Sequence, residues 1–202
     1  MDFYGLLIST GVVALAEIGD KTQLLSLMLA ARYPKHAWPI VWGILLATLA
    51  NHALAAYVGH WVAGLLSPDL LRWILGIGFL ALGAWLLIPD KLDEDQAAKP
   101  AKGAWAIFVL TTSLFFIAEM GDKTQIATIA LGAKYDSVLS VTLGTTMGMM
   151  LANAPAVWLG QQFTKRLPIV GASDCSHDFY SARNGYSTLG WESYLITYLG
   201  SN

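Results

Sequence analysis

The chain has 202 residues, of which 55% are hydrophobic and only 13% are charged, and its formal net charge is −2. A soluble domain normally carries about 25% charged residues, so this composition indicates an integral membrane protein with too few polar residues for a separate soluble domain. The small net charge gives no basis for binding nucleic acid. The single cysteine, Cys175, excludes an intrachain disulfide and a cysteine-based metal site.

Five apolar stretches are long enough to cross a bilayer, which takes about 20 residues of helix. The N-terminus lacks the basic segment and cleavage site of a signal peptide, so we expect the first stretch to be retained as a span. The first and fourth stretches are long for one straight span and carry a glycine between two carboxylates, which predicts a tilted, kinked or broken helix. The predicted spans are 3–31, 38–66, 69–88, 104–133 and 138–163.

The first and fourth stretches contain nearly the same eight residues. The segment 16–23 reads AEIGDKTQ and the segment 118–125 reads AEMGDKTQ, with one mismatch and an offset of 102 residues from Ala16 to Ala118. The same offset aligns Leu29, Ala31, Tyr33 and the triplet 49–51 with Leu131, Ala133, Tyr135 and the triplet 151–153, and it places Lys134 opposite Arg32. One ungapped register across two spans indicates an internal duplication.

The duplication predicts the fold class, an all-α integral membrane protein built from two inverted three-helix repeats. The first repeat covers 1–88, a charged linker covers 89–103, and the second repeat begins at 104 with two clear spans up to 167. Because three spans reverse the direction of the chain, the second copy must be inverted, as in secondary transporters.

The distribution of basic residues predicts the orientation of the chain in the membrane. Seven lysines and arginines lie in the linker and in the two loops on the same side of the membrane, against two in the other loops. The positive-inside rule then places the linker in the cytoplasm and the N-terminus outside. We expect a multi-pass protein of the cell inner (plasma) membrane.

The segment 168–202 departs from this pattern. Symmetry predicts an apolar sixth span after Leu167, but the chain there is polar, beginning with the segment 171–178, GASDCSHD. One hypothesis is a reading-frame slip near residue 170, and the other is a natural, disordered soluble tail. The nucleotide sequence of the gene distinguishes them.

The repeated phrase carries the polar chemistry of the chain. A carboxylate near the centre of a bilayer costs roughly 2.5–3.5 kcal/mol, so two in each copy indicate a transport path. Glu17 and Asp20, and likewise Glu119 and Asp122, are three residues apart, which predicts that each pair shares one helix face. Four converging carboxylates cannot all remain ionised and unpaired. They must bind cations, bind protons, or alternate between the two.

The predicted ligands are all oxygen donors, and neither phrase contains cysteine or histidine. Such a set suits hard divalent ions, Ca²⁺, Mn²⁺ or, less well, Mg²⁺, over Cu or Zn. The sequence leaves Mn²⁺ and Ca²⁺ open. The predicted metal-binding residues are Glu17, Asp20, Thr22, Gln23, Asn51, Glu119, Asp122, Thr124, Gln125 and Asn153.

Several of the polar residues in and around the phrases have a second interpretation. Asn51 and Asn153 complete the ligand shell or hydrogen-bond another helix. Lys21 and Lys123 are counter-charges to the carboxylates, or they pair with a neighbour and only shape the fold. Thr48 and the pair 145–146 line the path or serve helix packing, which we favour.

The doubled motif Glu-x-Gly-Asp-Lys-Thr resembles the Gdt-type cation/proton antiporter family (uncharacterised protein family sixteen), over roughly 3–167. The resemblance implies export or organelle loading of a divalent cation, driven by a counter-flow of protons. It also implies that Glu17, Asp20, Glu119 and Asp122 bind the substrate. The short chain is similar to the bacterial members, for which manganese efflux is the expected role.

We therefore expect a secondary transporter that exports Mn²⁺ or Ca²⁺ in exchange for protons, with Glu17 and Glu119 as the proton carriers. Its expected partners are the ion, protons and the lipid bilayer, with no cofactor, no enzyme activity and no nucleic acid. Assembly into a homo-oligomer is left open. The alternatives are a passive cation channel, an intramembrane aspartyl protease, in which Glu17 would replace a usual glycine, and a permease for lysine or another metabolite.

Overall fold

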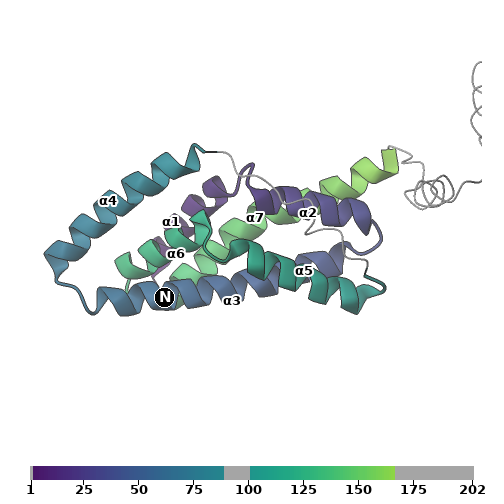
Figure 1. Cartoon of the computed structure of the whole chain (residues 1–202). Helices are drawn as coiled ribbons and strands as arrows, with labels where there is room; N and C mark the ends of the chain where they lie inside the picture. Colours follow the sequence, from purple (N-terminus) through teal and green to yellow (C-terminus); the bar gives the residue numbers. More distant parts are fainter. Residues whose placement is uncertain (1, 89–100, 167–202) are drawn as a thin grey trace, which may run out of the picture. The chain divides into compact units, whose positions relative to one another are not determined.

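The computed structural model describes residues 2–88 and 101–166, and within them all regular secondary structure is helical. Most of the linker and the segment 168–202, with the frame-slip hypothesis attached to it, lie outside the described residues. The helices are α1 (Phe3–Ala16), α2 (Lys21–Arg32), α3 (Ala37–Ala63), α4 (Pro68–Leu86), α5 (Ala104–Glu119), α6 (Lys123–Lys134) and α7 (Val138–Arg166), as labelled in Figure 1.

The two long stretches that carry the acidic phrases are each broken into two helices. The helices α1 and α2 meet at a bend of 71°, and α5 and α6 meet at the same angle. The sequence predicted a tilted, kinked or broken helix, and the broken form is the one observed. The prediction that Glu17 and Asp20 share one helix face is wrong, because the break falls between them.

Apolarity and length support four of the five predicted spans. Among the described residues, α3 and α4 are each long and apolar enough to cross a membrane, and each bent pair passes the same test as one span. The 29-residue helix α7 is not among them. Its buried residues include five with hydroxyl or amide side chains, which lower its hydropathy: Ser140, Thr142, Thr145, Thr146 and Asn153.

The long helix α3 packs along both members of the second bent pair, α5 and α6 (Figure 1). Two glycines allow the close approach. A Cβ on Gly43 would lie 2.8 Å from the Cβ of Thr111 in α5, and a Cβ on Gly59 would collide with the backbone at Ile129 in α6. Because a glycine brings two helix backbones together, these contacts fix the spacing of the helices.

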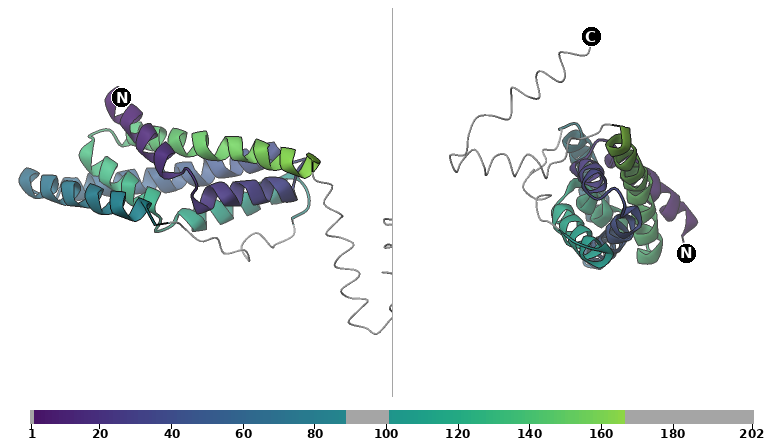
Figure 2. Two further views of the ribbon diagram at one scale, coloured as in Figure 1. Left: turned by 90° about the horizontal axis from the view of Figure 1, so that it is seen from above. Right: turned by 90° about the vertical axis from the view of Figure 1, so that its right-hand side faces the viewer.

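The long helix α7 packs in the same way against the first bent pair, α1 and α2 (Figure 2). A Cβ on Gly144 would lie 2.5 Å from the carbonyl oxygen of Leu6 in α1, and one on Gly160 would lie 2.7 Å from that of Leu27 in α2. Each half of the chain therefore supplies the long helix that packs against the broken pair of the other half.

A large apolar cluster fills the end of the helices where the linker rejoins the chain, and we name it the linker-end cluster. Ala101 packs against it, and the backbone N–H of Ala101 donates to the Tyr33 hydroxyl at 3.0 Å. By contrast, Leu82 is the buried residue of α4, and most of the other large apolar side chains of this helix are exposed, as expected of a helix that faces lipid. The linker-end cluster comprises Leu25, Leu29, Ala30, Ile40, Val41, Ile44, Ala47, Ile107, Phe115 and Val157.

The glycine contacts between α3 and α6 generate a prediction about stability. Gly59→Ala forces α3 away from Ile129 and is expected to destabilise the protein by about 1–3 kcal/mol, the usual cost of overpacking. Gly76→Ala in α4 is the control, because nothing lies within 4 Å of its added Cβ. Thermal unfolding of the purified protein in detergent measures both. Equal melting temperatures for the two variants would contradict the close packing of α3 on α6.

Candidate functional site: a buried carboxylate cluster

The two helix breaks place the carboxylates of the repeated phrase. Glu17 follows the last residue of α1, and Asp20 precedes the first residue of α2. Between them Gly19 has φ of 79°, a conformation that side chains disfavour. The Asp20 N–H donates to the Glu17 carbonyl oxygen at 3.2 Å, which closes the turn.

The second break reproduces the first. Glu119 is the last residue of α5, Asp122 precedes α6, and Gly121 has φ of 77°. The Asp122 N–H donates to the Glu119 carbonyl oxygen, again at 3.2 Å. The duplication seen in the sequence is therefore a duplication of backbone geometry as well.

A threonine holds each glutamate. The Thr22 hydroxyl donates to Glu17 Oε2 at 2.6 Å, and the Thr124 hydroxyl donates to Glu119 Oε2 at 2.9 Å. Both threonines and both glutamates are buried. Each hydroxyl therefore orients one carboxylate oxygen, and the other oxygen has no hydrogen-bond partner among the described residues.

The glutamines of the phrase have a different position from the threonines. Gln23 Oε1 accepts from the Gly19 N–H at 2.9 Å, and Gln125 Oε1 accepts from the Gly121 N–H at 2.7 Å. The Gln23 amide also donates to the Ala152 carbonyl oxygen in α7 at 3.2 Å. In this structure the two glutamines brace the helix breaks with the oxygen atoms that were predicted to be metal ligands.

Three carboxylates from the two breaks converge. Glu17, Glu119 and Asp122 offer oxygen atoms that all lie within 4.8 Å of one another, and all three side chains are buried. Glu17 Oε1, Glu119 Oε1 and Asp122 Oδ2 have no hydrogen-bond partner among the described residues. Asp20 is also buried but is not one of the three, and its Oδ2 accepts from Thr22 at 3.4 Å. The predicted set of four carboxylates is thus a compact set of three with Asp20 beside it.

Both lysines of the phrases make polar contacts. Lys21 Nζ lies 2.9 Å from Asp122 Oδ1, and this ion pair links the first phrase to the second. Lys123 Nζ donates to the carbonyl oxygen of Ile88, just beyond the end of α4, at 2.7 Å. For Lys21 the counter-charge interpretation is the one that the geometry favours, since its ammonium group contacts a carboxylate of the cluster.

The two asparagines also differ. Asn153 donates to Glu17 Oε2 at 3.2 Å, and its own Oδ1 accepts from the Ser26 hydroxyl at 2.8 Å. Asn51 donates to the Phe116 carbonyl oxygen in the last turn of α5 at 3.0 Å. Sequence reasoning missed Ser26. The signal was available, because Thr128, a second buried hydroxyl residue, lies 102 residues further on.

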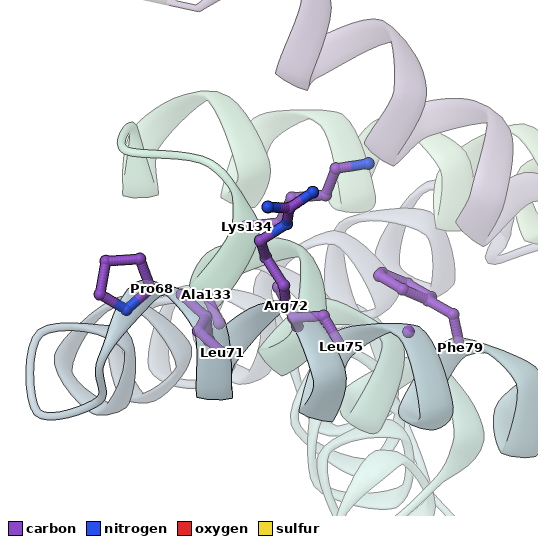
Figure 3. Close-up of a pocket in the computed structure, with 8 residues that line it drawn as sticks. Pro68, Leu71, Arg72, Leu75, Phe79, Ala133 and Lys134 are labelled. Atoms are coloured by element: carbon purple, nitrogen blue, oxygen red, sulfur yellow. The ribbon is translucent and has the colours of Figure 1, made fainter.

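A surface pocket of about 500 Å³ between α4 and α6 lies outside the cluster (Figure 3). Its lining is apolar except for the cationic side chains of Arg72 and Lys134. Positive charges repel a metal ion, so this pocket is no alternative to the carboxylate cluster as a cation site.

The electrostatics of the cluster limit what it can do. Carboxylates this close in a region of low dielectric constant cannot all be ionised without compensating charge. The ammonium group of Lys21 forms an ion pair with Asp122 and supplies one positive charge. Glu17 and Glu119 also lie at helix C-termini, where the helix dipole favours a cation and opposes a negative charge. Protons or a metal ion must supply the remaining charge, and oxygen donors suit a hard divalent ion.

Comparison with known proteins identifies a matching family and similar proteins. The family described as "Divalent cation/proton antiporter GDT1" matches residues 5–94 and 107–172. A Vibrio cholerae protein named "Putative manganese exporter" is 55% identical over 165 residues, covering 81% of this chain and 80% of that protein. A GDT1-like protein of Synechocystis is 30% identical over 174 residues, covering 77% and 82%. No solved structure matches the chain.

The positive φ angles at the helix breaks generate a prediction. Gly19→Ala and Gly121→Ala are each expected to destabilise the protein by roughly 1–2 kcal/mol, because a Cβ disfavours the left-handed conformation. Gly11→Ala is a matched control, since Gly11 lies inside α1 and, like the other two, has nothing within 4 Å of an added Cβ. Thermal melting in detergent makes the comparison. If Gly19→Ala melts at or above the temperature of Gly11→Ala, the break geometry is wrong.

Proposed function

Because this chain belongs to the GDT1 family of divalent cation/proton antiporters, we propose that it exports a divalent cation from the cytoplasm in exchange for protons. We take Mn²⁺ as the principal substrate, as the name of the Vibrio cholerae relative suggests, and Ca²⁺ as the second candidate. One observation carries the proposal. Glu17, Glu119 and Asp122 are buried and offer carboxylate oxygens within 4.8 Å of one another, and each of these carboxylates has one oxygen with no hydrogen-bond partner among the described residues.

In the metal-bound state, we assign the carboxylates of Glu17, Glu119 and Asp122 as primary ligands. Asp20 lies next to them and supplies a fourth carboxylate after a small side-chain movement. The hydroxyl and amide oxygens of Thr22, Thr124 and Asn153 complete the shell. We assign Gln23, Gln125 and Asn51 to the frame of the site, because the side chain of each forms a hydrogen bond with a backbone group.

Exchange follows from competition for the same oxygens. A divalent ion that enters the cluster displaces protons from Glu17 and Glu119, and protons that enter from the other side displace the ion. The cluster is then charge-compensated in both states, and an uncompensated state is costly in low dielectric. Lys21 acts as a tethered cation that pairs with Asp122 when no metal is bound and withdraws when the metal arrives.

The architecture that we propose for this exchange is a pair of inverted repeats, with the cluster at their interface. Support comes from the repeated break, the repeated threonine–glutamate hydrogen bond and the exchange of long helices between the halves. The chain is a membrane protein by its apolar helices. We propose that it lies in the inner (plasma) membrane, with its N-terminus outside and the linker in the cytoplasm.

The other functions fit the site less well. An aspartyl protease needs two aspartates that share a proton, whereas the cluster contains two glutamates and Asp122. A channel needs no ammonium group that competes with the ion for Asp122, as Lys21 does. An organic substrate needs more room than three oxygen atoms within 4.8 Å allow. We keep the passive channel as the alternative that the transport experiment must exclude.

Removal of a cluster carboxylate is expected to abolish transport. Glu17→Gln and Asp122→Asn keep the shape of each side chain but remove a negative ligand, so Mn²⁺ uptake into inverted vesicles should fall by at least about a hundredfold, the scale on which charged ligands act. Asp69→Asn, an exposed carboxylate in the first turn of α4, is the control and should transport normally.

A pH-sensitive dye inside the same vesicles reports the counter-flow. Under the proposal, Mn²⁺ entry is accompanied by loss of protons from the interior. Mn²⁺ entry without any proton movement would favour the channel, and undiminished transport by both cluster variants would remove the proposed site.

Lys21→Met tests the tethered cation. Without the ammonium group the metal no longer competes for Asp122, so the KM for Mn²⁺ should fall. The ion should also leave more slowly, so kcat should fall with it. Lys134→Met, which removes an exposed lysine beside the Tyr135 ring, is the control and should change neither. A higher KM in Lys21→Met would contradict the competition, and transport assays over a range of Mn²⁺ concentrations decide the matter.

A further inference from the structure

The two ends of the helix bundle are sealed by different kinds of side chain. At one end lies the linker-end cluster, in which Leu25, Ile40, Ile44 and Phe115 are each at most 1% exposed. All four are bulky and apolar. Packing of this kind excludes water.

The residues that align with these four in the other repeat, at the offset of 102 residues, have smaller or more polar side chains. In the alignment of the two repeats, Ala127 corresponds to Leu25, and Val13 corresponds to Phe115. Thr142 and Thr146 correspond to Ile40 and Ile44. These four side chains are buried too. The apolar cluster at their end of the bundle is smaller and comprises Ala56, Leu131, Tyr135 and Val141.

Three hydroxyls at this second end have no hydrogen-bond partner in the described part of the chain: those of Ser9, Thr142 and Thr146. They are 0%, 5% and 5% exposed. By comparison, the neighbouring Thr145 hydroxyl donates to the carbonyl oxygens of Val141 and Thr142 within its own helix. A buried polar group without a partner is costly and rare. Three of them together indicate that water or an ion contacts these hydroxyls.

The two threonines lie in register with the carboxylate cluster. Thr142, Thr146, Met149 and Asn153 recur at intervals of four, three and four residues, which places them on one face of α7. Asn153 donates to Glu17 Oε2. With a rise of about 1.5 Å per residue, Thr146 lies roughly 10 Å and Thr142 roughly 16 Å along the helix from Asn153. The face therefore leads from the cluster to the N-terminal end of α7.

Ser9 lies on α1 where that helix meets the same part of α7. Its Cβ would be 2.9 Å from a Cβ on Gly144, which lies between Thr142 and Thr146 in the sequence. The hydroxyl residue therefore comes from a second helix at the same level of the bundle.

The matching tyrosines show the same difference between the ends. Tyr33, at the end of α2, accepts a hydrogen bond from Ala101 and packs against the linker-end cluster. Tyr135, at the end of α6, is buried, and its hydroxyl has no partner among the described residues. The hydroxyl of Tyr33 is therefore bonded, whereas that of Tyr135, which lies in the smaller apolar cluster, has no such contact among the described residues.

We propose that the hydroxyls of Ser9, Thr142 and Thr146 form a polar path along which the divalent ion moves between the carboxylate cluster and the N-terminal end of α7. The inference rests on the proposed transport function. It adds the route that the ion takes and the side of the membrane to which this route leads. Under the proposed topology this end faces outside, so the path is the exit for the exported ion. The linker-end cluster is the opposing seal, which must separate for the ion to enter from the cytoplasm.

Neutral hydroxyls suit such a path for a physical reason. Their oxygens replace part of the hydration shell of a divalent ion, which lowers the cost of its passage through a region of low dielectric constant. They carry no charge, so they do not hold the ion as the carboxylates do. The ion is therefore solvated along the path but bound only at the cluster.

Thiol labelling tests the route independently of transport. In a Cys175→Ser background, single cysteines are placed at Thr146 and at its counterpart Ile44, and a charged, membrane-impermeant thiol reagent is applied from each side. We expect Thr146→Cys to react from one side only, and about tenfold or more faster than Ile44→Cys reacts from either side, because the apolar seal must first open. Mn²⁺ should slow the reaction at Thr146→Cys.

Equal rates at the two positions, or faster labelling of Ile44→Cys, would overturn the inference. So would a reaction at Thr146→Cys that Mn²⁺ leaves unchanged in protein that transports Mn²⁺. If the rate difference is present in protein that transports no Mn²⁺, the polar path stands and the proposed function fails, so the two failures are distinguishable.

A transport measurement tests whether the hydroxyls themselves matter. The double variant Thr142→Val/Thr146→Val keeps the shape of both side chains and should lower the Mn²⁺ transport rate by about tenfold. Equilibrium Mn²⁺ binding to the detergent-solubilised protein should not change, because the cluster is intact. Thr145→Val, equally buried but with its hydroxyl bonded within α7, should transport at the normal rate. Equal rates for the double variant and Thr145→Val would overturn the role of the hydroxyls.

Discussion

Three buried carboxylates that share one small space, one of them paired with the ammonium group of Lys21, are the interaction on which the rest of this structure depends. The oxygen atoms of Glu17, Glu119 and Asp122 are within 4.8 Å of one another, and Lys21 pairs with the last of them. Such a group is stable only when protons or a cation compensate its charge. The same requirement that makes the cluster costly to fold is the one that couples two ion flows under the proposed function.

The broken helices are the backbone's contribution to this cluster. At each break a glutamate lies at the end of one helix and an aspartate lies immediately before the next, with a glycine of positive φ between them. The C-terminal ends of α1 and α5 present their negative dipole ends beside the glutamates, which favours a cation there. A continuous helix would place the carboxylates on its surface with no free backbone groups nearby. The break therefore supplies electrostatics as well as geometry, and the threonine and glutamine side chains of the phrase hold it in place.

The exchange of long helices explains how two distant segments meet. The helix α3 packs on α5 and α6, and α7 packs on α1 and α2, in each case through glycines that bring backbones into contact. Neither half could build its side of the cluster without the other, because Asn153 of the second half holds Glu17 of the first. The halves then differ in detail, with isoleucines at one end and threonines at the other. That difference gives an otherwise duplicated site two unlike sides.

The sequence by itself determined the membrane class, the duplication, the four carboxylates and the place of the helix breaks, because composition and an ungapped repeat are visible without coordinates. It also led to the family. Only the tertiary structure decided that three of the four carboxylates converge, that Lys21 pairs with Asp122 of the second phrase, and that the Gln23 amide reaches Ala152 in α7. The physical reason is that each of these depends on contacts between residues about a hundred positions apart. Spacing along the chain places a side chain on a local turn or face, whereas packing between the halves decides which atoms it meets.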